Sequence, residues 1–304
     1  MDTKTNVFMI MVVVAFLAIS GCQQQSSAVS GPYKYEGDMA VVASFVLDAP
    51  VSLETDPYSQ NEEIDVDVEI VNKLPEDLPA GKVKVRLNAD AAISTFFTGA
   101  KEMSSPLLSG IDSETGEETP EEVSLGPVKY VADLPTKASK EITGQYCYSY
   151  PVKVKGFLYY TDRTDEIGQN LPAGSNPPSA VQVTDIEQRA VDIQSDDSAV
   201  LKFKVTVANL GDGVVIGAMD DCFKYRKKTE REVLKLTASG GYPISCDNDG
   251  EVRLSRDTGR KVVNCEVSGI DARNLGNQPS ELSLTLGTFA YQQDLDPVTI
   301  WLEP

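Results

Sequence analysis

Four cysteines in the body of the chain carry its clearest chemistry: Cys147, Cys222, Cys246 and Cys265. An even number of cysteines in an exported chain is typical of disulfide bonds, and four cysteines allow three pairings. One lies in the N-terminal half and three lie in the C-terminal half, so complete pairing needs one bridge between the halves. We predict Cys147–Cys222 and Cys246–Cys265. The alternative is one bridge within the C-terminal half and two free thiols.

The chain has no histidine among its 304 residues. This excludes nucleophile systems that use an imidazole base, and it excludes most zinc and copper sites. Carboxylates, lysines, tyrosines and cysteines remain, but 46 Asp and Glu residues are too many to mark a site. We therefore predict a non-enzyme without a cofactor. A hydrolase that uses a carboxylate pair is kept as an alternative.

The segment CDNDGE offers the weak metal candidates Asp247, Asp249 and Glu251. Calcium takes six to eight oxygen ligands, and an EF-hand spreads its ligands over a 12-residue loop. The segment is too short for such a loop, and a turn at Asp249-Gly250 explains it without a metal. A second candidate surface is the row Tyr146, Tyr148 and Tyr150, which suits either sheet packing or a stacking platform for sugars.

The N-terminus combines an apolar run, two small residues and a cysteine. The run Val7–Ile19 has 13 residues, fewer than the roughly 20 that span a bilayer as a helix. It has the length of the apolar part of a secretory signal. Ser20-Gly21-Cys22 resembles a lipobox, which implies cleavage before Cys22 and a lipid on its sulfur. An ordinary signal peptide and an uncleaved anchor are the alternatives.

The net charge of the chain limits the kinds of partner that it can bind. The formal charge is −19, so phosphates of nucleic acid would be repelled, as would an anionic membrane surface. We expect no nucleic-acid partner, and we expect membrane contact through the lipid alone.

Alternating apolar and polar residues predict an all-β fold. Ile64–Ile70 and Val83–Leu87 each show one apolar face and one charged face, acidic in the first and basic in the second. Such faces would attract each other if the two strands were neighbours. Thr258-Gly259 lies between two alternating runs and predicts a hairpin. No segment of the N-terminal half predicts a convincing helix.

Changes in amino-acid composition along the chain predict its division into five segments. Residues 1–21 form the predicted signal peptide, and residues 22–37 form a lipidated N-terminus and flexible tether. Residues 38–165 and 180–304 are predicted β-sandwiches, separated by a linker rich in proline and glycine at 166–179.

An internal repeat supports two copies of one module. Ile64-x-Val66-x-Val68-x-Ile70-Val71-Asn72 matches Leu201-x-Phe203-x-Val205-x-Val207-Ala208-Asn209, and both end in asparagine and a turn. The alternative is that any two amphipathic strands look alike.

The lipobox-like start, VDVEIVNK, YCYSYPVKVKGFLYYT and FKVTVANLGDG together resemble archaeal cell-surface lipoproteins. Those proteins carry tandem immunoglobulin-like modules of the CARDB-like or S-layer-associated type. The resemblance implies a lipid-anchored protein on the extracellular face of the cell membrane, with a structural or adhesive role. The chain departs from such proteins in having no Asn-x-Ser/Thr sequon. A surface lipoprotein that binds polysaccharide or a small ligand is the alternative function.

Interaction candidates come from charge and from the single tryptophan. The densest basic run holds Lys224, Arg226, Lys227 and Lys228, and an acidic loop lies at 112–122. Contact between these loops would join copies of the chain, or the two halves of one chain. Partners are then other envelope proteins or the chain itself. Trp301 alternates out of phase with Ile300 and Leu302, so we expect it to cover a sheet edge or a domain junction.

Overall fold

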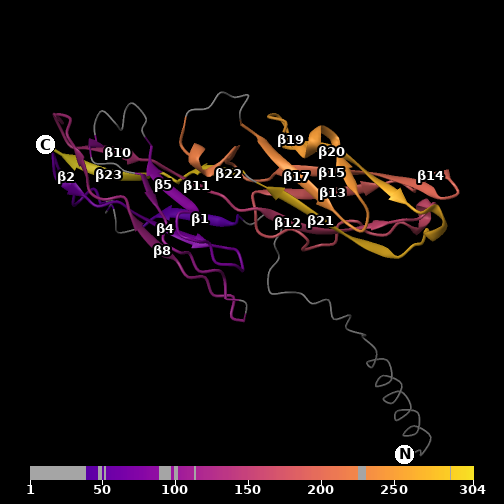
Figure 1. Ribbon diagram of the computed structural model, residues 1–304. Coiled ribbons are helices and arrows are strands. Elements are labelled where there is room, and N and C mark those ends of the chain that lie inside the picture. Colours follow the sequence, from indigo (N-terminus) through magenta and orange to yellow (C-terminus); the bar gives the residue numbers. More distant parts are fainter. Residues whose placement is uncertain are drawn as a thin grey trace, which may run out of the picture. The chain divides into compact units, whose positions relative to one another are not determined.

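A computed structural model describes residues 39–304, apart from 47–49, 51–52, 89–96, 99–101, 113, 225–230 and 288. The fold is all-β, as predicted, with several sheets packed over a common core (Figure 1). Within these described ranges, no helix is long and apolar enough to cross a membrane.

We call residues 39–165 the N-terminal half and residues 180–304 the C-terminal half. Strands of the N-terminal half are β1 (Val41–Phe45), β2 (Tyr58–Ser59), β3 (Glu63–Ile64), β4 (Asp67–Asn72), β5 (Val83–Leu87), β6 (Phe97–Thr98), β7 (Glu102–Ser104), β8 (Glu121–Ser124), β9 (Val128–Tyr130), β10 (Ala138–Ile142), β11 (Gly144–Tyr148) and β12 (Val152–Tyr159).

Strands of the C-terminal half are β13 (Val181–Gln188), β14 (Asp192–Ser195), β15 (Ser198–Asn209), β16 (Val214–Ile216), β17 (Val233–Ser239), β18 (Ile244–Cys246), β19 (Glu251–Arg253), β20 (Arg260–Ile270), β21 (Pro279–Gly287), β22 (Ala290–Asp294) and β23 (Val298–Glu303). Short 3-10 turns are η1 (Thr164–Glu166), η2 (Met219–Asp221), η4 (Asp247–Gly250) and η5 (Ala272–Asn274).

Three sheets stay within one half of the chain and three combine both halves. The sheets β1-β4-β8 and β3-β9-β6 belong to the N-terminal half, and β13-β15-β20-β18 belongs to the C-terminal half, with β14 also paired to β15. The sheets β10-β23-β2, β16-β22-β11-β5-β7 and β12-β21-β17-β19 are mixed. Strand pairing therefore crosses the predicted boundaries at 165 and 180, and the number of domains stays a prediction.

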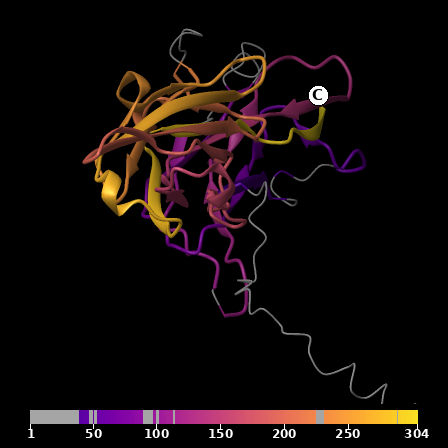
Figure 2. The same ribbon diagram turned by 90° about the vertical axis from the view of Figure 1, so that its right-hand side faces the viewer.

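The mixed sheets are built on one antiparallel ribbon. β12 lies along β21, with Val152 opposite Leu286, and β11 lies along β22, with Tyr148 opposite Tyr291. The chain then continues into β23, which inserts between β10 and β2. Figures 1 and 2 show the yellow C-terminal strand beside indigo and magenta strands of the N-terminal half. Each half is thus completed by strands from the other.

Burial follows the alternation predicted from the sequence. Every second residue from Ile64 to Asn72 is buried, and the residues between them are exposed or half-buried. The run changes sheets after Ile64, because β3 pairs with β9 whereas β4 pairs with β1 and β8. Alternation fixes the face of a residue but leaves its neighbouring strand open.

Two local predictions need correction. β4 and β5 lie in different sheets, so the acidic and basic faces do not meet, and Lys84 instead pairs with Glu102 of β7 at 3.3 Å. The predicted hairpin around Thr258-Gly259 is wrong as well. The turn forms, with the Gly259 N–H donating to the Ser255 carbonyl at 2.7 Å, but it joins β19 and β20, which belong to different sheets.

Buried residues of both halves form one continuous core. Three tyrosines, Tyr146, Tyr148 and Tyr291, lie where β11 meets β22, and the rings of Tyr148 and Tyr291 are 5.7 Å apart. The Tyr291 hydroxyl accepts a hydrogen bond from the Gly213 N–H at 2.6 Å, and burial raises the pKa of Tyr291 to about 12. Tyr146 and Tyr148 are therefore core residues and do not form a platform for sugars.

The two copies of the repeat share their local geometry. Asn72 accepts from the Leu74 N–H and donates to the Glu76 carbonyl, and Asn209 accepts from the Gly211 N–H and donates to the Gly213 carbonyl. Each asparagine closes the turn that follows its strand. The partner strands match too, since Val41 lies opposite Asn72 and Val181 lies opposite Asn209. A duplicated module predicts this agreement, and the duplication itself stays a prediction.

The connection at 166–179 is held by side-chain amides. The Asn176 side chain bonds both the N–H and the carbonyl of Val183, at 2.9 and 2.8 Å. Gln188 bonds the N–H and the carbonyl of Tyr159 in the same way, and Asn170 donates to Gln188 at 2.7 Å. The amide groups of Asn176 and Gln188 thus each satisfy a backbone N–H and a backbone carbonyl, as a neighbouring strand would do.

We predict that Asn72→Ala lowers the free energy of unfolding by about 2–3 kcal/mol, because a 1% exposed side chain loses bonds to Leu74, Glu76 and Leu108. Guanidinium denaturation under oxidising conditions measures this. Asn264→Ala is the control, since that exposed residue makes one side-chain bond and should cost below about 0.5 kcal/mol. Equal losses would contradict the capping role.

Candidate functional site

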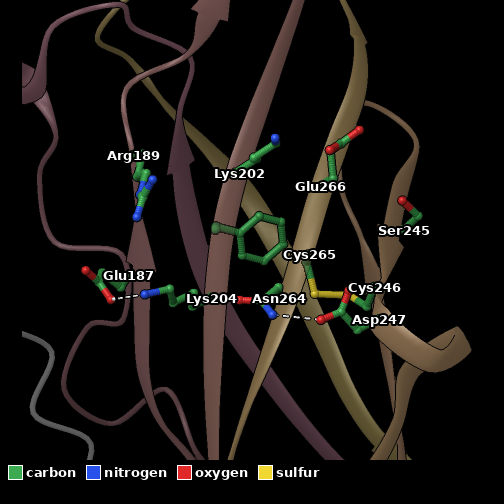
Figure 3. A pocket seen from close by; sticks show the side chains of 11 residues that line it. Glu187, Arg189, Lys202, Lys204, Ser245, Cys246, Asp247, Asn264, Cys265 and Glu266 are labelled. Atoms are coloured by element: carbon green, nitrogen blue, oxygen red, sulfur yellow. Dashed lines mark hydrogen bonds and ion pairs between the residues drawn. A yellow bond between two sulfur atoms is a disulfide. The ribbon is translucent and has the colours of Figure 1, made fainter.

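A hollow of about 490 Å³ lies over the outer face of β13-β15-β20-β18 (Figure 3). We call it the β15–β20 groove. The two central strands form its floor, and β13 and β18 form its sides. Its lining residues are Glu187, Arg189, Lys202, Phe203, Lys204, Ser245, Cys246, Asp247, Asn264, Cys265 and Glu266.

Strand register arranges the polar lining in two rows. Lys202 lies opposite Glu266, which lies opposite Ser245, and the Arg189 N–H donates to the Lys202 carbonyl at 3.1 Å. The first row is therefore Arg189, Lys202, Glu266 and Ser245. The second row is Glu187, Lys204, Asn264 and Asp247, because Lys204 lies opposite both Glu187 and Asn264.

The second row is internally paired. Lys204 forms an ion pair with Glu187 at 3.5 Å, and Asn264 donates to the Asp247 carboxylate at 2.7 Å. In the first row, no described carboxylate lies within ion-pair distance of Arg189 or Lys202. The groove thus has a cationic end over β13 and β15, and an end with carboxylates over β20 and β18.

The Cys246–Cys265 disulfide holds one side of the groove. The two residues lie directly opposite in the β18–β20 ladder; Cys265 is 3% exposed and Cys246 is half-buried. β18 is only three residues long, so the disulfide fixes an edge strand that carries Ser245 and leads into Asp247.

The CDNDGE segment after β18 forms a tight turn. Asn248 and Asp249 have positive φ, and Gly250 has a φ of +79°. A Cβ on Gly250 would lie 2.0 Å from the Leu236 carbonyl oxygen, so this position requires glycine. Asp247 is bonded to Asn264, and Glu251 lies 3.6 Å from Arg253. Among the described residues, no group of three His, Cys, Asp or Glu side chains is placed to hold a metal ion.

The Cys147–Cys222 disulfide joins the two halves, and both disulfides are the pairs predicted from the sequence. Cys147 lies on the face of β11 opposite Tyr146 and Tyr148, and it is fully buried as well. The segment after β16 covers it, and a small apolar cluster forms there from Cys147, Ile216, Cys222, Phe223 and Ala290.

Phe223 fixes this covering segment. Its N–H donates to the Gln292 side chain at 2.9 Å, and its ring lies 4.5 Å from the Arg86 guanidinium. Arg86 also donates to Gln145 at 3.1 Å. Burial lowers the pKa of Arg86, while the nearby Glu102 carboxylate opposes that shift. The cation–π contact and the disulfide both tie the C-terminal half to the N-terminal half.

Most of the remaining sequence candidates stand apart from the groove. Cys22, Arg226, Lys227 and Lys228 lie outside the described residues, and Lys224 is exposed. In the acidic loop, Glu118 pairs with Lys73 of the same half. Trp301 lies on β23, the central strand of its sheet, half-buried and 5.7 Å from the Lys137 ammonium. It therefore covers a sheet face and not an edge.

Sequence reasoning singled out Asp247 and the cysteines but missed the other charged residues of the groove. Each of those residues occupies an outward position on a strand, as do many other charged residues of the chain. Only the register of four strands brings them together. A search against protein-family models found no match, and a search of curated proteins found none either.

We predict that removing the inter-half disulfide destabilises the chain more than removing the groove disulfide. The sequence separations are 75 and 19 residues, for which loop-closure entropy gives roughly 4.5 and about 3.2 kcal/mol. The variants are Cys147→Ala/Cys222→Ala and Cys246→Ala/Cys265→Ala, compared by guanidinium denaturation. The reverse order would contradict the view that Cys147–Cys222 is the main covalent constraint.

Proposed function

We propose that this chain is a non-catalytic, lipid-anchored protein on the extracellular face of a cell membrane, with a structural or interaction role. The observation that carries the proposal is the interlocking of the two halves through β12, β22 and β23, reinforced by Cys147–Cys222. An arrangement of this kind suits a body that holds a surface at a fixed position outside the cell.

Interlocking supports this role because it removes the usual freedom between modules. Modules joined by one linker move relative to each other unless their interface is large and apolar. Here the ribbon of β11–β12 with β21–β22 and the shared core replace such an interface. The disulfide adds a covalent link between the same two halves.

Anchoring rests on Ser20-Gly21-Cys22 after the apolar run. A lipidated Cys22 would leave residues 23–37 as a tether whose end-to-end distance is roughly 20 Å. Because a single acyl chain binds a membrane reversibly, stable anchoring takes more than one chain on the lipidated cysteine. Anionic membranes offer this chain little attraction, given its charge of −19.

We predict one cooperative thermal transition for both halves, because strands and core are shared. Differential scanning calorimetry of the oxidised protein measures this through the ratio of the calorimetric to the van't Hoff enthalpy, which should be close to one. Two separate transitions, or a ratio well above one, would mean that the halves unfold independently.

We predict that Cys22→Ser moves the protein out of the membrane fraction. The wild-type mature chain should begin at Cys22, and its intact mass should exceed the peptide mass by that of a lipid. Fractionation and intact-mass spectrometry of the two proteins test this. A wild-type N-terminus elsewhere, without added mass, would overturn the anchoring proposal.

A further inference from the structure

The cationic end of the β15–β20 groove holds two neighbouring positive charges, Arg189 and Lys202. Neither forms an ion pair with a described carboxylate, although Glu266 lies opposite Lys202 across the β15–β20 ladder. Arg189 and Lys202 are both exposed and are neighbours across the β13–β15 ladder. Like charges facing each other across a ladder repel, and because both side chains are exposed, solvent screening keeps this repulsion small. The chain has 46 acidic residues, yet no described one pairs with either cation. Such an arrangement favours an anionic ligand over a purely structural role.

The other end of the groove offers hydrogen-bond acceptors. Glu266 and Asp247 present carboxylate oxygens, and Ser245 presents a hydroxyl group. Asn264 holds the Asp247 carboxylate in place through its 2.7 Å bond. Carboxylates accept hydrogen bonds from hydroxyl donors, but they repel a second anionic group. A matching ligand therefore carries an anion at one point and hydroxyl groups close to it.

We infer that the groove binds a carboxylated polysaccharide, with a uronate carboxylate at Arg189 and Lys202. Neighbouring sugar hydroxyls then donate to Glu266 and Asp247. A uronic acid carries both kinds of group on one ring. The groove is open along a sheet face, which suits an extended polymer (Figure 3).

Recognition relies on charge and hydrogen bonds. Phe203, the aromatic residue of the lining, is 2% exposed and packs in the core, so no sugar stacks on its ring. The net charge of −19 opposes any polyanion at long range, so binding depends on close contacts within the groove.

This inference goes beyond the proposed function and does not depend on the lipid. Binding is therefore tested on the full chain carrying Cys22→Ser, purified in oxidised form. If binding fails, the anchoring proposal stands, and if anchoring fails, the groove is still testable.

The experiment is affinity electrophoresis in gels that contain polygalacturonate. We expect retardation of the parent protein, and at least a tenfold weaker affinity for Arg189→Glu/Lys202→Glu, because a charge-assisted contact is reversed. The control is Lys153→Glu/Lys235→Glu, which makes the same charge change at exposed positions of the sheet β12-β21-β17-β19. The control should bind like the parent. Circular dichroism checks that both variants fold, and Arg189→Gln/Lys202→Gln replaces the reversal if it does not.

Three further measurements separate the contribution of ligand charge from the contribution of sugar hydroxyl groups. Neutral dextran should cause no retardation, and polyglutamate should retard the parent less than polygalacturonate does. Asp247→Asn/Glu266→Gln should weaken polygalacturonate binding while leaving polyglutamate binding unchanged or stronger. The inference is overturned if the parent is not retarded by polygalacturonate, if both charge-reversal variants lose binding equally, or if polyglutamate binds as well as polygalacturonate.

Discussion

The pairing of β11–β12 with β21–β22 is the constraint on which the rest of this structure depends. Two stretches, 144–159 and 279–294, run antiparallel to each other through both halves of the chain. The sheets on either side attach to this ribbon, β5 through β11 and β17 through β21. The tyrosines at the centre of the core belong to the same ribbon. Neither half has a complete set of strands without it.

This constraint explains why other features are found where they are. Cys147 reaches Cys222 because β11 and β22 are neighbours and β16 pairs with β22 on the far side. Gln188 reaches Tyr159 because β12 lies near β13. Amide side chains are well suited to such positions, since one amide group satisfies both an N–H and a carbonyl that no strand pairs. The sequence at 166–179 is rich in proline and glycine, yet its asparagines make it an ordered connection.

Much of the fold is predictable from local pattern. Alternation identifies β5 with its observed bounds, and it identifies β4 and β15 as strands. The repeated asparagine identifies the related ends of β4 and β15. Counting one cysteine in one half and three in the other predicts a bridge between the halves if all four are paired, but it leaves open which cysteine pairs with Cys147. The local pattern does not identify the neighbouring strand. The alternation of apolar and polar residues shows which face of a strand is buried, but not which strand lies beside it. That gap accounts for the wrong hairpin at Thr258-Gly259 and for the missed exchange of β12, β22 and β23.

The groove also arises from the register between neighbouring strands, which the local sequence pattern does not show. Along β15 alone, Lys202 and Lys204 are two lysines on a solvated face, which needs no further explanation. The bulge in β13 between Val183 and Asp185 shifts the register, and Glu187 rather than its neighbour comes to lie opposite Lys204. Arg189 then extends past the paired region and lies beside Lys202. This register leaves two cations side by side at the end of the β13–β15 ladder, with Glu266 opposite Lys202 on its other side. Its electrostatic cost falls on two exposed side chains, where solvent screening makes it small.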